Sequence, residues 1–213
     1  MTVWPLPRLI GLCGPRRAGK DTLAEVLSAT EAYHPIALAT PLKTLAETLW
    51  PHGFPRDAVQ ALGATVRAQD DAALIQVVLR TIHAAPPSQR WVITDIRMPH
   101  ELAQFQTTFR DEFAAIAITA RPDILAQRIA QSTRPDALQE TRSSGTDITE
   151  QWAQQIPDAV QAVWDTSDVG PTDPFSAWAL RLHSSAWWAT HPLRCSHDPV
   201  PMAKEPPRYG RPR

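Results

Sequence analysis

A glycine-rich segment near the N-terminus constrains the fold of this chain more than any other feature. Leu9–Cys13 is a short apolar run that predicts a buried strand, and Thr22–Leu27 has the pattern of a helix start. Between them, four residues separate Gly14 from Gly19-Lys20. Glycines at these positions let the backbone fold around an anion, so that N–H groups and the helix N-terminus point at phosphate oxygens. Lys20 would add a mobile positive charge, and we interpret the segment as a phosphate-binding loop.

The position after the lysine departs from the commonest form of such a loop. It holds Asp21 in place of Ser or Thr, and Thr22 follows. A chance match of strand, glycines, lysine and helix is the alternative interpretation. The order of the predicted elements around the motif argues against chance.

Composition excludes several classes of protein. At 213 residues the chain can build one substantial core. Its 21 basic and 22 acidic residues nearly cancel, which argues against a nucleic-acid partner and against binding to a membrane surface by charge. Cys13 and Cys195 make no disulfide framework, so a cytoplasmic location is expected. No apolar run approaches the ~20 residues of a membrane span, and Pro5, Pro7 and Arg8 interrupt any signal-peptide pattern.

Strand and helix patterns alternate along the chain. Besides the first strand, the patterns predict strands over 33–39, 91–97, 113–119 and 159–164. They predict helices over 40–49, 56–63, 70–83, 124–131, 147–155 and 175–183, and another that opens at Met98-Pro99. Thr40 is the expected N-cap, with Pro41 at the first helical position. Crossovers of this length imply an α/β fold, with a parallel sheet of about five strands flanked by helices. Ligands of such sheets bind at the carboxyl ends of the strands.

Four stretches of the first half then carry a resemblance. They are the glycine-lysine-aspartate-threonine loop at 14–22, Ala-Leu-Ala-Thr-Pro-Leu-Lys at 37–43, Leu-Gly-Ala-Thr-Val-Arg at 62–67 and Ile-Thr-Asp-Ile-Arg-Met-Pro-His-Glu at 93–101. Together they resemble the deoxynucleoside monophosphate kinase family best known from bacteriophages, which is similar to other P-loop nucleoside monophosphate kinases. Two features depart from the family pattern. Thr40 replaces an acidic residue, and Asp-Ile-Thr-Glu at 147–150 keeps only half of a histidine-proline-serine-glutamate element.

The resemblance implies a P-loop NTPase fold and an ATP-dependent, Mg²⁺-requiring kinase that phosphorylates a deoxynucleoside 5′-monophosphate. The kinase domain would span 1–183. It would include an acceptor-binding helical region near 40–85 and a small cationic lid near 128–150, and a Pro-rich tail would occupy 184–213. The partner would be a small-molecule nucleotide. The oligomeric state stays open, a homodimer included.

Candidate site residues follow from the needs of phosphoryl transfer, which are positioning and neutralisation of charge. The candidates for catalysis are Lys20, Asp95, Arg97 and Arg128. Those for binding ATP are Gly14, Arg16, Arg17, Ala18, Gly19, Lys20, Asp21, Thr22 and Arg121. Those for binding the acceptor are Lys43, Arg67, Asp95 and Arg97, because a guanidinium can fork onto a phosphate. The oxygen donors for Mg²⁺ would be Thr22, Asp21 and Asp95. Strand alternation places Asp95 and Arg97 on the same side of their strand.

Some of these residues have a second interpretation. Arg128 can equally be a solvated residue on a helix surface. Lys43 can be a surface residue, although a cation near a helix start is slightly unfavourable. The spacing of Asp147 and Glu150 favours helix capping over catalysis. Asp95 is hard to explain structurally at the end of a buried strand, which favours a functional role.

Two rival functions remain at this stage. One is a P-loop kinase with another acceptor, such as dephospho-coenzyme A or a hydroxymethylated pyrimidine in DNA. The other is a nucleotide-binding regulator that has kept the loop and lost turnover. Thr40 and the missing flap histidine favour the regulator, whereas Lys20, Asp95 and Arg97 favour a kinase.

Overall fold

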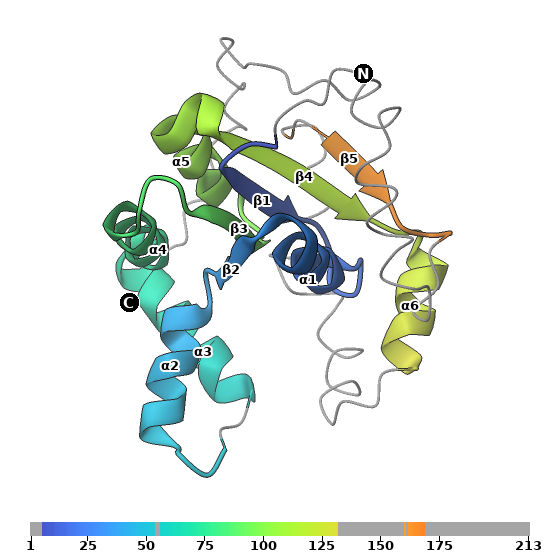
Figure 1. Ribbon diagram of the computed structural model, residues 1–213. Helices are drawn as coiled ribbons and strands as arrows, with labels where there is room; N and C mark the ends of the chain where they lie inside the picture. Colours follow the sequence, from blue (N-terminus) through green and yellow to red (C-terminus); the bar gives the residue numbers. More distant parts are fainter. Residues whose placement is uncertain (1–5, 54–55, 132–159, 161, 169–213) are drawn as a thin grey trace.

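One parallel sheet organises the protein. The computed structural model describes residues 6–53, 56–131, 160 and 162–168. The strands are β1 (Leu9–Cys13), β2 (Tyr33–Ala37), β3 (Arg90–Ile96), β4 (Phe113–Thr119) and β5 (Ala162–Asp165). They lie in the order β2-β3-β1-β4-β5 (Figure 1), and every neighbouring pair is parallel. The predicted α/β fold with about five parallel strands is confirmed.

Helices connect the strands and flank the sheet. They are α1 (Lys20–Glu31), α2 (Thr40–Leu49), α3 (Arg56–Gln69), α4 (Ala73–Ala84), α5 (Pro99–Phe109), the 3-10 turn η1 (Arg110–Glu112) and α6 (Pro122–Ala130). In Figure 1, α2 and α3 extend away from the sheet on the side of β2, and α6 lies near the end of β5. The segment predicted as the acceptor-binding region therefore contains α2, α3 and α4. The predicted helices at 147–155 and 175–183, the lid beyond residue 131 and the Pro-rich tail lie outside the described residues.

Several predicted boundaries are wrong for identifiable reasons. The prediction ended a helix at Gly63, yet α3 continues to Gln69. Gly63 is buried, and a Cβ there would lie 3.0 Å from the Leu42 side chain, so this glycine allows α2 and α3 to approach closely. Thr40 is not the N-cap of α2. Ala39 takes that position, and the Thr40 hydroxyl accepts a hydrogen bond from the backbone N–H of Ala37 at 3.2 Å.

The sheet is buried on both faces because its central strands are apolar throughout. On one face, α4 and α5 cover alternate residues of β1, among them Leu9 and Cys13, and Phe105 is fully buried there. On the other face, α1 covers Ile10 and Leu12. Continuous apolar runs are typical of strands that are covered on both sides. None of the helices that the structure describes combines the length and the apolar character needed to cross a membrane.

Candidate phosphoryl-transfer site

The predicted phosphate loop connects β1 to α1 in the expected way. Its backbone has positive φ at Gly14 (122°), Arg17 (62°) and Gly19 (104°). Gly14 is required where it stands, since a Cβ there would lie 2.0 Å from the carbonyl oxygen of Ile118 in β4. Ala18 is fully buried, whereas Arg16 and Arg17 are half-buried. The loop is thus fitted against the end of the neighbouring strand.

Lys20 folds back over the loop that it follows. Its side chain is buried, with 8% of the residue exposed. The ammonium Nζ donates hydrogen bonds to the carbonyl oxygens of Gly14 at 2.8 Å and Pro15 at 2.6 Å. A buried ammonium must have such partners to offset its desolvation. The cation is therefore anchored beside the loop to which the sequence assigns phosphate binding.

The candidate Mg²⁺ donors lie on two elements. Asp21 is exposed and Thr22 is half-buried, both in the first turn of α1, while Asp95 lies near the end of β3. The described part of the chain holds no cluster of three or more His, Cys, Asp or Glu side chains able to hold a metal ion by itself. A hydroxyl with one or two carboxylates fits Mg²⁺, which commonly keeps several waters and is shared with substrate phosphates.

A bulge shapes the end of β3. Gly11 of β1 pairs with Ile93, but Cys13 pairs with Ile96, so β3 has one extra residue over this interval. Asp95 lies within it and has a φ of 72°, a left-handed conformation that Asp tolerates better than most residues. The Arg97 Nε donates a hydrogen bond to Asp95 Oδ1 in a half-buried ion pair. The structure therefore brings these two predicted site residues together.

Glu101 stabilises this turn through two hydrogen bonds, and it was not among the predicted site residues. It is only 3% exposed, and its Oε2 accepts hydrogen bonds from the backbone N–H groups of Arg97 at 2.9 Å and Met98 at 3.0 Å. Burial raises the pKa of Glu101, while the two N–H groups and the charge of Arg67 oppose that rise. Two signals in the sequence pointed to it: Glu101 ends the stretch 93–101 that carries the resemblance, and it lies in the first turn of a helix that opens with Pro99.

Arg67 reaches the same region from α3. Its charge lowers the pKa of Glu101, which lies in the first turn of α5. Gly63, one turn earlier, leaves room for it, because a Cβ at that position would lie 3.2 Å from Arg67 Nη1. Of the predicted acceptor residues, Arg97 therefore contacts Glu101 through its backbone N–H, and Arg67 acts on the pKa of Glu101 through its charge. Lys43, in contrast, is exposed in the first turn of α2.

Cys13 is a buried residue at the end of β1, directly before the phosphate loop. The thiol is fully buried, and burial raises the pKa of Cys13 to about 12. Lys20 lowers that pKa and Glu101 raises it, so both charges act on one sulfur atom. Because Cys13 also pairs with Ile96 across the strands, the two candidate anion-binding groups lie at neighbouring strand ends.

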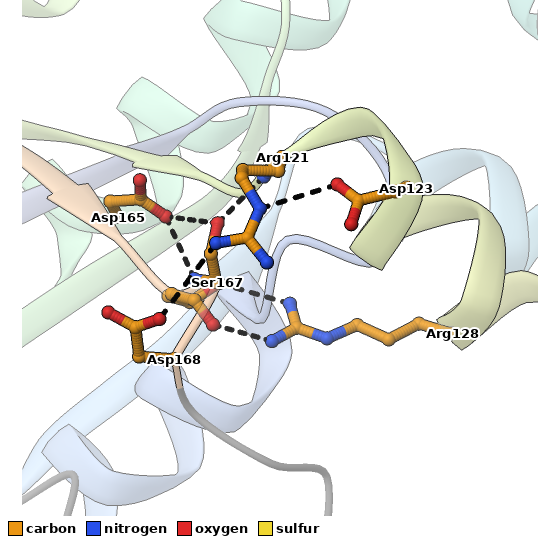
Figure 2. Close-up of polar contacts among 7 residues, drawn as sticks. Arg121, Asp123, Arg128, Asp165, Ser167 and Asp168 are labelled. Atoms are coloured by element: carbon orange, nitrogen blue, oxygen red, sulfur yellow. Dashed lines mark hydrogen bonds and ion pairs between the residues drawn. The ribbon is translucent and has the colours of Figure 1, made fainter.

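A second polar network surrounds α6 and the end of β5. Figure 2 shows Arg128 extending from α6 toward the segment that follows β5. Its guanidinium donates to the Thr166 hydroxyl at 3.0 Å, to the Thr166 carbonyl at 2.7 Å and to the Arg17 carbonyl at 3.1 Å. Partial burial lowers the pKa of Arg128. The interpretation of Arg128 as a solvated helix residue is therefore wrong, and its partner Thr166 was not among the predicted site residues.

Arg121 lies at the exposed edge of this network. Its guanidinium forms ion pairs with Asp123 at 3.4 Å and with Asp168 at 4.0 Å (Figure 2). Its backbone N–H donates to the Ser167 hydroxyl at 2.8 Å. Ser167 also donates to Asp165 through its hydroxyl and its N–H, which holds the pKa of that exposed carboxyl below its usual value. The hydrogen bond between Arg121 and Ser167 thereby joins the segment after β4 to the segment after β5.

Comparison with known proteins supports the fold. No protein-family model and no curated protein sequence matches the chain. A shikimate kinase from Bacteroides thetaiotaomicron superposes with a TM-score of 0.50 and 14% identity, over 82% of this chain and 95% of that one. A candidate kinase from Chloroflexus aurantiacus J-10-fl gives 0.49 and 16%, over 84% and 99%. A gluconokinase from Sinorhizobium meliloti 1021 gives 0.42 and 14%, over 88% and 100%. The chain therefore has the α/β fold of P-loop kinases, and similarity at this level shows the fold alone.

Proposed function

We propose that this protein is a P-loop kinase that transfers the terminal phosphate of ATP to a deoxynucleoside 5′-monophosphate. The observation that carries the proposal is that two cationic groups follow neighbouring parallel strands. Lys20 and the phosphate loop follow β1, and Arg97 follows β3, the adjacent strand of the sheet. The loop suits a polyphosphate donor, and the two guanidiniums suit a dianionic phosphomonoester.

In this proposal each group has a distinct task. The loop N–H groups and Lys20 bind the ATP phosphates and neutralise charge as it develops. Arg67 and Arg97 bind the acceptor phosphate and orient it toward the donor, which supplies the positioning that phosphoryl transfer needs most. Mg²⁺, when bound, would neutralise the donor phosphates, and Thr22 and Asp95, with Asp21 as a further candidate, would help to hold it.

The deoxynucleoside part of the proposal rests on the resemblance of the four sequence stretches. Solved structures with this fold include kinases named for shikimate and gluconate, which are hydroxy acids. A carboxylate can also bind a guanidinium, so hydroxy acids belong in the test. The near-neutral charge of the chain argues against DNA as the acceptor, since DNA binding draws on many phosphate contacts.

The test is ATP consumption with Mg²⁺ against a panel of acceptors. The panel contains the four deoxynucleoside monophosphates, the ribonucleotide monophosphates, dephospho-coenzyme A, an oligonucleotide with hydroxymethylated pyrimidines, shikimate and gluconate. We expect turnover with a deoxynucleoside monophosphate and its loss in Lys20→Met, which keeps the aliphatic stem but removes the cation. Arg80→Ala, at an exposed position on α4, is the control for loss of a surface cation.

Three outcomes would contradict the proposal. Turnover with a hydroxy acid alone would assign another acceptor class. Full activity of Lys20→Met would refute the assignment of the loop. ATP binding without turnover of any acceptor would favour a nucleotide-binding regulator.

A further inference from the structure

Thr166, the first residue after β5, contacts both the phosphate loop and the end of β4. Thr166 is fully buried. Its hydroxyl oxygen lies 2.8 Å from the carbonyl oxygen of Ala18 and 3.0 Å from that of Thr119, and its proton serves these two acceptors. Its backbone N–H donates to the Thr119 carbonyl at 2.8 Å. One side chain therefore joins the phosphate loop to the end of β4.

Arg128 completes the arrangement from α6. One of its nitrogens, Nη1, donates both to the Thr166 hydroxyl and to the Arg17 carbonyl, and Nη2 donates to the Thr166 carbonyl. The carbonyls of two successive loop residues, Arg17 and Ala18, are thus each held by a side chain from a distant segment. We call Thr166 and Arg128 the loop clamp.

The geometry of the peptide bond gives this clamp a functional consequence. In a trans peptide the C=O of one residue and the N–H of the next point in opposite directions. Holding the carbonyl of Arg17 toward Arg128 therefore directs the N–H of Ala18 away from the clamp, and that N–H donates to the Pro15 carbonyl at 3.5 Å within the loop. Holding the carbonyl of Ala18 toward Thr166 does the same for the N–H of Gly19.

The loop also needs such support. Arg17 has a φ of 62°, in the left-handed region that is unfavourable for residues with a side chain. Conformations of this kind persist where surrounding contacts fix them. Without the clamp, the peptides on either side of Ala18 would lose the contacts that orient their N–H groups.

We infer that Thr166 is a positioning residue for ATP binding, and that with Arg128 it fixes the loop peptides so that the Gly19 N–H is directed toward the donor phosphates. This inference rests on the proposed function, because it takes ATP as the ligand of the loop. Thr166 acts through the backbone of the loop and is not assigned a contact with the nucleotide.

The experiment compares three substitutions in the full-length protein. Thr166→Val keeps the shape of the side chain but loses the hydroxyl, and Thr166→Ser keeps the hydroxyl. Thr81→Val is the matched control, because the exposed Thr81 on α4 donates its hydroxyl to the Val77 carbonyl at 3.0 Å. Calorimetry measures the affinity of each for ATP with Mg²⁺ and for inorganic tripolyphosphate, at a temperature where thermal melts show all variants folded.

We expect Thr166→Val to bind both ligands about tenfold more weakly, the size of effect that one lost hydrogen bond can produce. Thr166→Ser should recover most of this affinity, and Thr81→Val should bind as the native protein does. Arg128→Met should weaken binding in the same direction. The double variant should be less affected than the two single effects predict when added, because both residues hold the same loop. Full additivity, or native affinity in Thr166→Val, would overturn the inference.

Hydrogen exchange separates this inference from the proposed function. In the nucleotide-free protein, amides of the loop peptide around residues 17–20 should exchange faster in Thr166→Val than in the native protein. Unchanged exchange would refute the clamp whatever the ligand is. Faster exchange in a protein that binds no ATP would retain the clamp and refute the proposed function.

Discussion

Replacing Gly14 by alanine tests the backbone geometry of the phosphate loop. Gly14 has a φ of 122°, and a Cβ there would lie 2.0 Å from the Ile118 carbonyl oxygen. Gly53, in the turn after α2, offers a matched control. Its φ is 111°, but a Cβ there would meet nothing within 4 Å. Comparing Gly14→Ala with Gly53→Ala separates the cost of a positive φ, which both positions share, from a steric clash, which only the Cβ of Ala at position 14 would meet.

The expected magnitudes follow from these two contributions. A left-handed backbone costs a residue with a side chain about 1–2 kcal/mol. Forcing extra atoms into a close-packed site typically costs ~1–3 kcal/mol more. The free energy of unfolding should therefore fall by about 1–2 kcal/mol in Gly53→Ala and by about 2–5 kcal/mol in Gly14→Ala. Because 1 kcal/mol shifts the Tm of a chain of this size by about 2–4 °C, Gly14→Ala should melt roughly 2–12 °C below Gly53→Ala.

Thermal unfolding followed by circular dichroism measures the difference, and ATP titration measures its functional effect. The Gly14 carbonyl accepts a hydrogen bond from Lys20, so a shift of this residue also displaces the ammonium. At a temperature where both variants are folded, Gly14→Ala should bind ATP more weakly than Gly53→Ala. Equal melting temperatures would show that the loop does not pack against β4 as described.

Three further predictions concern other parts of the structure. Arg97→Lys keeps the charge but loses the planar fork, so the kcat/KM for the acceptor should fall about 10- to 100-fold in initial-rate assays. ATP affinity should stay native in this variant, and an unchanged kcat/KM for the acceptor would contradict the role of Arg97. Burial raises the pKa of Glu101 in the folded state. Its contribution to stability is therefore greatest below its unfolded pKa and is lost as pH rises through the folded value. The Tm of the native protein should accordingly fall relative to that of Glu101→Gln as pH rises above about 4, the pKa of an unfolded glutamate, and a constant difference would refute this. Tyr33 donates its buried hydroxyl to the Pro7 carbonyl at the opposite end of the sheet. Tyr33→Phe should lower the free energy of unfolding in urea by about 1 kcal/mol with turnover unaffected, and a loss of turnover would contradict that location.

The strands and helices were predictable wherever local patterns decided them. β4 has the predicted bounds because an uninterrupted apolar run lies between a charged turn and a Pro-containing helix start. The end of α3 was not predictable, because a buried glycine and a terminating glycine look alike in a sequence. The contact of Gly63 with Leu42 in α2 decides between them, and that contact belongs to tertiary structure.

The residues of the candidate site also differ in whether a local sequence pattern could predict them. Lys20 stands in a local motif with strong chemical requirements, and that motif alone led to its prediction as a phosphate-binding residue. Thr166 stands in no motif, and it contacts Arg128 and Ala18, which are 38 and 148 positions away in the sequence. No periodicity of the chain reports contacts over such separations. The predicted lid lies beyond residue 131, outside the described residues, and it stays a prediction.

Asp95 and Arg97 form an ion pair, although the argument that placed them on the same side of their strand was incomplete. Strand alternation placed both on one side, but the bulge in β3 interrupts regular alternation at this point. The left-handed backbone of Asp95 lies in the turn where its carboxylate accepts the Arg97 Nε. Glu101 holds the backbone N–H of the same arginine. Carboxylates therefore hold Arg97 through both its side chain and its main chain. If Arg97 binds the acceptor as proposed, an arginine oriented in this way loses less conformational entropy on binding a phosphate than a mobile one would.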